Sequence, residues 1–238
     1  MPINKVVATF ADAVADIPDG ATLMIDGFAG PGGTPQNLIL ALRDHGAKDL
    51  TIVSNTAGLA SVVGFGTLPG DVPTDIGVLV DNEQVKKVIA SFPVSPSPSR
   101  PNSFERAYRE GKVELELVPQ GTLAERIRAG GAGIPAFFTP TGPGTQLADG
   151  KEVRVFDGRE HVLEHALKAD FALLRGHRAD VMGNVVYKGT SRNFNGVMAT
   201  AAGVTVMEVD EIVETGELDG GDVHTPSIFV NRIVKIPG

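Results

Sequence analysis

A glycine-rich segment near the N-terminus combines residue types that can bind an anion. Residues 26–33 read Asp-Gly-Phe-Ala-Gly-Pro-Gly-Gly and follow the short apolar run Thr22–Ile25. Pro35 suits the first turn of a helix, so the segment is expected to join a buried strand to a helix N-terminus. Backbone N–H groups and the helix dipole favour phosphate or carboxylate at such a place. Because Pro35 stands where the third glycine of a G-x-G-x-x-G dinucleotide fingerprint belongs, the segment is either a tight connection or a surface for another ligand or partner.

Gln120 offers a second kind of chemistry, because an uncharged amide can donate a hydrogen bond to a developing oxyanion. It follows an expected strand over Val113–Val118, and a turn containing Gly121 is expected to lead into a helix over Leu123–Ala129. Binding residues in open α/β sheets usually lie at the carboxyl ends of strands. The plainer interpretation is a loop amide that is hydrogen-bonded to backbone.

Five glycines follow within residues 130–144, around the pair Phe137–Phe138. Glycine permits close backbone approach and positive φ angles. The sequence leaves open whether these glycines approach a ligand or another chain.

Residues His161 to His165 read His-Val-Leu-Glu-His and match the H-x-x-E-H pattern of some zinc hydrolases. A helix expected over Glu160–Lys168 would place both histidines on one face. A catalytic zinc also needs a third protein ligand and an open position, and short matches often arise by chance. The favoured interpretation is a solvated amphipathic helix, and no metal site is expected. The sequence also has no cysteine and no G-x-S-x-G elbow, so it offers no nucleophile of those two kinds.

Short apolar runs alternate with amphipathic patterns along the chain, which predicts an α/β fold with an open, mostly parallel sheet and helices on both faces. The expected strands cover Thr22–Ile25, Leu50–Ser54, Val85–Ser91, Val113–Val118, Val153–Phe156, Phe171–Leu174 and Val204–Val209. The expected helices cover Val6–Ile17, Pro35–Leu42, Phe104–Glu110, Leu123–Ala129, Glu160–Lys168 and Asn195–Ala202. The proline-rich stretch Pro93–Pro101 is interpreted as a surface loop, with a domain linker as the alternative. Residues 1–238 are therefore expected to form one domain.

Composition limits the possible functions. The chain has 238 residues, a net charge of −8 and no cysteine, which excludes disulfides and thiolate metal sites. The sequence has no dense run of Lys and Arg of the kind that indicates nucleic-acid binding. No apolar run approaches the roughly 20 residues that span a bilayer, and the N-terminus does not resemble a signal peptide. A cytoplasmic protein that binds neither nucleic acid nor membrane is expected.

Several long segments together resemble the family I CoA transferases, specifically the A subunit of 3-oxoacid CoA transferases, over essentially the whole chain. The segments are Val118–Arg128, Gly133–Gly142, Ser54–Asn55, Asp170–Leu173, Asp180, Gly183–Asn184 and Arg192–Phe194. The resemblance implies the fold of that family and an enzyme that moves CoA from an acyl-CoA such as succinyl-CoA to a 3-oxo acid, either acetoacetate or 3-oxoadipate. It implies a CoA thioester as a substrate and no permanently bound cofactor.

The resemblance also implies a partner. In this family a glutamate of the B half, followed by Asn-Gly, attacks the thioester and later carries CoA as a glutamyl thioester, which splits one difficult step into easier ones. This sequence contains no Glu-Asn-Gly, and its only Asn-Gly, at Asn195, follows Phe194. A chain of this length is not expected to include a B half. The nucleophile is therefore expected on a separate B subunit, in a heterodimer or heterotetramer.

By the same resemblance, Gln120 stabilises the oxyanion of the tetrahedral intermediates. The residues expected to line the carboxylate-substrate side of the site are Gly27, Phe28, Gly30, Gly32, Gly33 and Asn55. The sequence departs from the family pattern in two places: the glycine segment is one residue longer, and Thr56 stands where a second asparagine is common. Two segments, Ala148–Arg154 and Ser91–Pro93, resemble the 3-oxoadipate type more closely. A non-catalytic ligand-binding or regulatory domain derived from a CoA transferase is the alternative.

Overall fold

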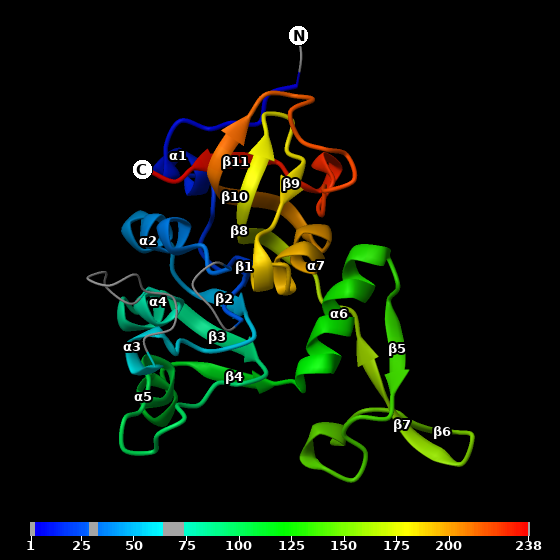
Figure 1. Cartoon of the computed structure of the whole chain (residues 1–238). Helices are drawn as coiled ribbons and strands as arrows, with labels where there is room; N and C mark the ends of the chain where they lie inside the picture. Colours follow the sequence, from blue (N-terminus) through cyan, green and yellow to red (C-terminus); the bar gives the residue numbers. More distant parts are fainter. Residues whose placement is uncertain (1–2, 29–32, 64–73, 238) are drawn as a thin grey trace.

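A computed structural model of the chain describes residues 3–28, 33–63 and 74–237. Its main sheet contains β1 (Thr22–Ile25), β2 (Leu50–Val53), β3 (Val85–Ala90), β4 (Glu114–Leu117), β8 (Ala169–Asp180), β9 (Val185–Val186), β10 (Ala202–Val213) and β11 (Arg232–Lys235). The strand order is β11-β10-β8-β1-β2-β3-β4, with β9 paired to β8 (Figure 1). Every pair in this sheet is parallel except β8 with β9. The prediction of an open, mostly parallel sheet is therefore confirmed.

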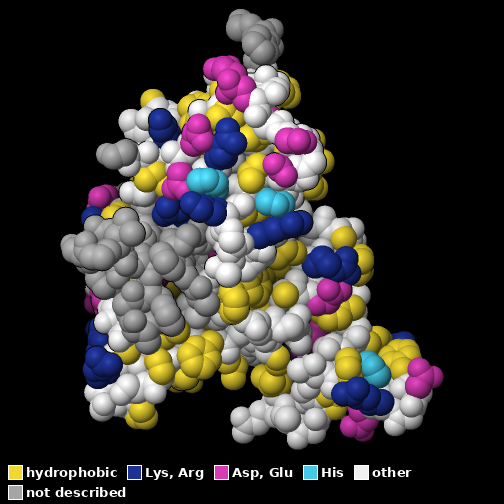
Figure 2. All heavy atoms as spheres, viewed as in Figure 1, with side chains coloured by type: hydrophobic (Ala, Val, Ile, Leu, Met, Phe, Trp, Pro, Cys, Tyr) yellow, Lys and Arg dark blue, Asp and Glu magenta, His cyan; other side chains and the backbone are white. Residues whose placement is uncertain are grey.

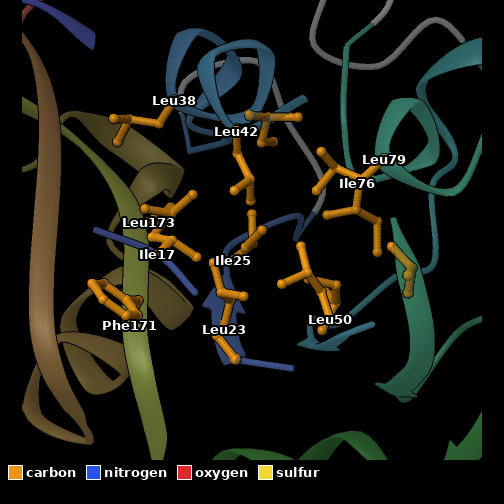
Figure 3. Close-up of a cluster of buried hydrophobic side chains, with 14 of the residues drawn as sticks. Ile17, Leu23, Ile25, Leu38, Leu42, Leu50, Ile76, Leu79, Phe171 and Leu173 are labelled. Carbon is orange, nitrogen blue, oxygen red and sulfur yellow. The ribbon is translucent and has the colours of Figure 1, made fainter. Parts of the chain in front are cut away.

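Helices cover both faces of this sheet, as predicted. One face packs against α1 (Phe10–Val14), α2 (Gln36–His45), α4 (Gly77–Asp81) and α5 (Ser103–Arg109), and the other against α6 (Gln120–Ala132) and α7 (Phe194–Thr200). Successive side chains of a strand point to opposite faces, so Leu23 and Ile25 of β1 enter the first core and Met24 enters the second. Figure 3 shows Leu42 of α2 above Ile25 in the first core.

Among the described residues, none of the helices combines the length and the apolar character that crossing a bilayer requires.

The first helix is shorter than predicted. A helix was expected over Val6–Ile17, but α1 covers only Phe10–Val14. Val6 instead forms a parallel bridge with Ile233, beside β11. The Thr9 side chain then accepts a hydrogen bond from the backbone N–H of Asp12 and begins the helix, because a Ser or Thr cap satisfies a free N–H of the first turn.

The proline-rich stretch Pro93–Pro101 leads from β3 to α5. It is followed by a capping box in which Asn102 and Glu105 each accept a backbone N–H of the other. The same two side chains also hold the loop, since Asn102 Nδ2 donates to Pro93 O at 3.0 Å and Glu105 Oε2 accepts from Ser95 N at 2.9 Å. The loop connects elements of one sheet, because β3 and β4 are neighbours.

A second, antiparallel sheet was not predicted. It has the order β5-β7-β6, formed by β5 (Ala136–Thr139), β6 (Val153–Phe156) and β7 (Arg159–His165). It protrudes from the main body below α6 (Figure 1), and hydrophobic and charged side chains are mixed on its outer end (Figure 2).

The helix predicted over Glu160–Lys168 is wrong, because most of this segment is strand β7. Asp157 and Gly158 have φ angles of 49° and 76° and join Phe156 to Arg159 as a two-residue hairpin. Asp-Gly is the preferred pair for such a turn, so this dipeptide was the signal that the sequence analysis missed.

The strand also changes the interpretation of the two histidines. At the rise of a strand, His161 and His165 lie about 13 Å apart, not on adjacent turns of a helix. Glu164 between them is engaged by Lys151 Nζ at 2.6 Å and lies 3.9 Å from Arg126 Nε. The described residues contain no group of three or more His, Asp or Glu side chains that could hold a metal ion.

Two glycines of α6 lie close to other parts of this chain. A Cβ at Gly130 would lie 2.1 Å from the carbonyl oxygen of Leu167, and a Cβ at Gly131 would lie 2.1 Å from Thr200 Oγ1 in α7. Side chains at these positions would push α6 away from its neighbours. The close packing therefore determines where the C-terminal end of α6 lies.

We predict that Gly130→Ala destabilises the protein by about 1–3 kcal/mol, because the added methyl group overlaps backbone that cannot move freely. Gly121→Ala is the matched control in the same helix, since a Cβ there meets nothing within 4 Å. That variant should be neutral or more stable by up to about 1 kcal/mol, the difference in helix propensity. Urea unfolding followed by circular dichroism measures both, and equal effects would contradict close packing at Gly130.

Candidate active site

Residues that follow four neighbouring strands line one cavity of about 380 Å³. The carboxyl ends of parallel strands meet at one edge of a sheet, which is where open α/β proteins place their sites. The lining consists of Gly27, Phe28, Thr34, Asn55, Thr56, Leu59, Ala60, Thr74, Asp75, Ser91, Phe92 and Gln120. Of the residues predicted for the site, Gly27, Phe28, Asn55 and Gln120 are brought together here. Gly30 and Gly32 lie outside the described residues.

Two side-chain amides form the polar edge of the cavity. Gln120 Nε2 donates to Asn55 Oδ1 at 2.9 Å. Asn55 is buried. Its backbone carbonyl oxygen accepts hydrogen bonds from the backbone N–H groups of Ser91 and Phe92, which joins the end of β2 to the end of β3. Among the described residues, the second N–H of the Gln120 amide has no partner. This N–H is therefore a donor held at the cavity by Asn55.

Gln120 is the first residue of α6, not part of a turn before the helix. Gly121, expected in a turn, lies inside α6. The positive end of the helix dipole and the free N–H groups of the first turn thus lie beside the Gln120 amide. The site therefore favours negative charge at this point.

Gly27 and Thr56 bring the ends of β1 and β2 together. Thr56 Oγ1 donates to Gly27 O at 3.2 Å. A Cβ at Gly27 would lie 2.9 Å from Ser54 Oγ and 3.3 Å from Thr56 Oγ1. A side chain at position 27 would therefore displace the Ser54 or Thr56 hydroxyl, and the threonine at position 56 has a structural role in holding the wall of the cavity.

Asp26 forms buried hydrogen bonds with the glycine segment and with α7. No role was expected for it from the sequence. Its carboxylate is fully buried. Oδ1 accepts from Phe28 N at 2.9 Å, and Oδ2 accepts from Asn195 Nδ2 at 2.6 Å. Asn195 Nδ2 also lies 3.1 Å from Gly33 O, so one buried pair holds both ends of the glycine segment. The available signal was an acidic residue directly after an apolar strand.

Burial raises the pKa of Asp26 to about 7, although its hydrogen bonds from Phe28, Gly27 and Asn195 act in the opposite direction. A charged carboxylate away from water is unfavourable unless its oxygens are hydrogen-bonded. Loss of these donors would therefore raise the pKa of Asp26 further and favour its neutral form.

Glu208 on β10 is a second buried carboxyl group, but it serves a different element. Its Oε2 accepts from Leu38 N of α2 at 2.9 Å, and Arg175 Nη1 lies 3.6 Å from Oε1. Burial raises the pKa of Glu208 to about 7 as well. Glu208 does not line the cavity.

Comparisons with known proteins identify relatives of nearly the full chain. The coenzyme A transferase family model matches residues 7–236. The A subunit of the 3-oxoadipate CoA-transferase of Pseudomonas putida is 48% identical over 236 residues, which cover 99% of this chain and 95% of the relative. The A subunit of the succinyl-CoA:3-ketoacid coenzyme A transferase of Xanthomonas campestris pv. campestris (strain B100) is 49% identical over 229 residues, with 94% and 87% coverage.

A solved structure has the same fold. The apoenzyme of acyl-CoA transferase from Escherichia coli O157:H7 superposes with a TM-score of 0.84 and 23% identity, and the match covers 100% of this chain and 48% of that chain. At this identity the similarity concerns the fold. It confirms the prediction of an α/β fold of this kind.

The raised pKa of Glu208 predicts a pH dependence of stability. In the folded protein the Glu208 carboxyl group stays protonated up to about pH 7. In the unfolded chain the same group has its ordinary pKa of about 4. Its contribution to stability is therefore complete below about pH 4 and is lost as the pH rises to about 7. Glu208→Gln cannot titrate, so the unfolding free energy of the wild type, relative to this variant, should fall between about pH 4.5 and 8. Urea unfolding across this range measures the difference, which would stay constant if the folded pKa were ordinary.

Proposed function

Because the chain belongs to the coenzyme A transferase family, we propose that it is the A subunit of a heteromeric CoA transferase. The enzyme moves CoA from an acyl-CoA such as succinyl-CoA to a 3-oxo acid, acetoacetate or 3-oxoadipate. The relatives named as A subunits of such enzymes support this proposal. The observation that carries the role of this chain is the hydrogen-bonded pair of Gln120 and Asn55 at the edge of the cavity.

The partner B subunit supplies the nucleophile in this proposal. A glutamate carboxylate of the partner attacks the thioester carbonyl carbon, and the carbonyl oxygen becomes an oxyanion until the CoA thiolate leaves. CoA then returns to the glutamyl carbonyl and the free acid departs. The acceptor carboxylate then attacks the glutamyl thioester, which releases the CoA thiolate and leaves a mixed anhydride between the glutamate and the acceptor. The thiolate attacks the acceptor carbonyl of this anhydride, which forms the new acyl-CoA and regenerates the glutamate carboxylate. Each tetrahedral intermediate carries negative charge that a hydrogen-bond donor stabilises.

Gln120 is the donor that this chain contributes. Asn55 Oδ1 accepts one N–H of the amide, which fixes the orientation of the group before the reaction begins. The other N–H then donates to the oxyanion. The N-terminal end of α6, where Gln120 lies, adds the favourable end of the helix dipole. The amide is uncharged, so it stabilises the oxyanion without exchanging a proton.

The glycine segment forms the wall for the acid in this proposal. Gly27, Phe28 and Asn55 line the cavity, and Gly33 is held beside it by Asn195. The roles of Gly30 and Gly32 stay predictions from the sequence. A heterodimer or heterotetramer, a single domain and a cytoplasmic location likewise stay predictions.

We expect Gln120→Ala to lower kcat by about 10²–10³-fold in the complex with the B subunit, the usual loss on removing one oxyanion donor. Gln146→Ala, at an exposed glutamine of the 3₁₀ helix η1 (Gln146–Ala148), is the matched control and should leave kcat unchanged. Initial rates of acyl-CoA formation measure both. Unchanged turnover in Gln120→Ala would favour the alternative of a non-catalytic, ligand-binding domain, and full activity of this chain alone would refute the need for a partner.

A second variant tests the support beneath the glycine segment. Asp26→Asn leaves one acceptor oxygen where Phe28 N–H and the Asn195 amide both require one. The wall of the site should therefore shift, and kcat/KM for the acid should fall about ten-fold or more, as expected for a buried donor left unpaired. Glu208→Gln is the control, because its buried carboxyl holds α2 and not the glycine segment. It should alter stability without altering kcat/KM for the acid, and an equal fall of kcat/KM in both variants would contradict this role of Asp26.

A further inference from the structure

The corner between β4 and α6 carries Gln120. β4 ends at Leu117, and Gln120 is the first residue of α6. Pro119 occupies the N-cap and gives the first turn no side-chain hydrogen bond, so the start of α6 lacks the contact that commonly fixes a helix N-terminus. In Figure 1, α6 stands between the main sheet and the β5-β7-β6 sheet. The position of the Gln120 amide therefore also depends on contacts farther along the helix.

Arg126 connects α6 back to β4 across this corner. Its side chain is only 10% exposed, and its Nη1 donates to Glu116 Oε1 at 2.7 Å. Glu116 precedes Gln120 in the chain and Arg126 follows it, so the ion pair closes a loop around the corner. A charge-assisted hydrogen bond is stronger than a neutral one and sets the geometry of its partners. This pair therefore fixes the angle between β4 and α6.

The same residue is also attached to the second sheet. Arg126 Nε donates to His165 O at 2.8 Å, and Arg126 O accepts from Leu167 N at 2.8 Å. Arg126 Nε also lies 3.9 Å from Glu164 Oε2. Arg126 is thus bound to β4 on one side and to the end of β7 on the other. At this residue α6 is held between the two sheets.

Each carboxylate beside Arg126 has a lysine as a second partner. Lys87 Nζ lies 2.6 Å from Glu116 Oε2, and Lys151 Nζ lies 2.6 Å from Glu164 Oε1. Breaking a buried ion pair is most harmful when it leaves a charge without a partner. A neutral residue in place of Arg126 leaves no carboxylate in that condition. Such a variant should therefore fold while it loses the contacts that hold α6.

A small movement at Arg126 is large enough to displace the Gln120 amide. The two residues lie about 9 Å apart along the helix axis, so a tilt of about 6° moves Gln120 by about 1 Å. Gln120 Nε2 lies 2.9 Å from Asn55 Oδ1, and a separation about 1 Å longer is no hydrogen bond. The amide could then rotate, and the donor would no longer be preorganised for an oxyanion.

We propose that Arg126 is a positioning residue for Gln120. Its ion pair with Glu116 holds α6 at the angle that keeps the Gln120 amide on Asn55, with the second N–H directed to the oxyanion. Arg126 does not line the cavity, so it acts on the reaction through Gln120 alone. This inference rests on the proposed function and extends the machinery of this chain to a residue outside the cavity.

Arg126→Met tests the proposal in the complex with the B subunit. We expect kcat to fall by about ten-fold or more, the scale on which a displaced catalytic group loses its effect. KM for the acid should change by less than about two-fold, because an interaction made only in the transition state is lost. Arg128→Met is the matched control on the same helix, since Arg128 is exposed and pairs with Glu125 at 2.6 Å.

The control should leave both constants unchanged. An unchanged kcat in folded Arg126→Met, or equal falls of kcat in the two variants, would overturn the proposal. Circular dichroism and urea unfolding establish that each variant is folded.

A double-mutant cycle separates positioning from a general structural effect. In the Gln120→Ala background, Arg126→Met should lower kcat by less than about two-fold, because the group that it positions is absent. Losses that multiply fully would show that Arg126 does not act through Gln120 and would overturn the proposal. Unchanged turnover in Gln120→Ala alone would instead overturn the proposed function, and this inference with it.

Glu116→Gln tests the same ion pair from β4 and decides the question if Arg126→Met fails to fold. The amide keeps one acceptor oxygen but loses the charge that engages both Arg126 and Lys87. We expect kcat to fall by about three-fold or more, since a charge-assisted hydrogen bond is roughly twice as strong as a neutral one. The fall should disappear in the Gln120→Ala background. Equal falls in both backgrounds would refute the positioning role.

Discussion

The buried hydrogen bond between Asp26 and Asn195 is the interaction on which the arrangement of the site depends. Asp26 ends β1, where the chain order of the sheet reverses, with β2, β3 and β4 on one side and β8, β10 and β11 on the other. Asn195 belongs to α7, and its Oδ1 accepts from Arg175 N of β8. One contact therefore joins β1, β8, α7 and the glycine segment. A buried carboxylate needs nearly all of its acceptor sites occupied, so this contact couples the positions of β1, β8 and α7.

The cavity follows from this constraint. With the glycine segment held, Gly27 can lie against Ser54 and Thr56, and the end of β2 then presents Asn55 to Gln120 at the start of α6. Each functional group is supplied by the end of a different strand. Rigid elements of this kind hold a donor in place more accurately than a long loop does, and a preorganised donor needs no reorientation when charge develops.

The proposed division of chemistry between two chains is consistent with the residues that line this cavity. Its described lining offers amides, hydroxyls, apolar groups and the carboxyl of Asp75, which already accepts two backbone N–H groups. Such a surface can orient an acid and stabilise an oxyanion. The covalent step falls to the partner in the proposed enzyme. In the proposed enzyme, orientation of the acid and formation of the covalent bond are therefore assigned to different polypeptides.

The sequence by itself determined the fold class and the elements whose signal is local. The run Thr22–Ile25 is β1 as predicted, and Val153–Phe156 is β6, because short apolar runs between turn residues identify strands. The resemblance to the CoA transferase family also indicated that Gln120 and the glycine segment belong to one site. The tertiary structure decided the rest. β7 was taken for a helix because the turn signal of Asp157-Gly158 was not used, and its pairing with β5 and β6 involves residues outside the segment itself. Asp26 and Asn195 are 169 positions apart, and a contact at that separation has no local pattern. The ion pair of the buried Arg126 with Glu116 is likewise visible only when every neighbour is in place, because burial is a property of the packed structure.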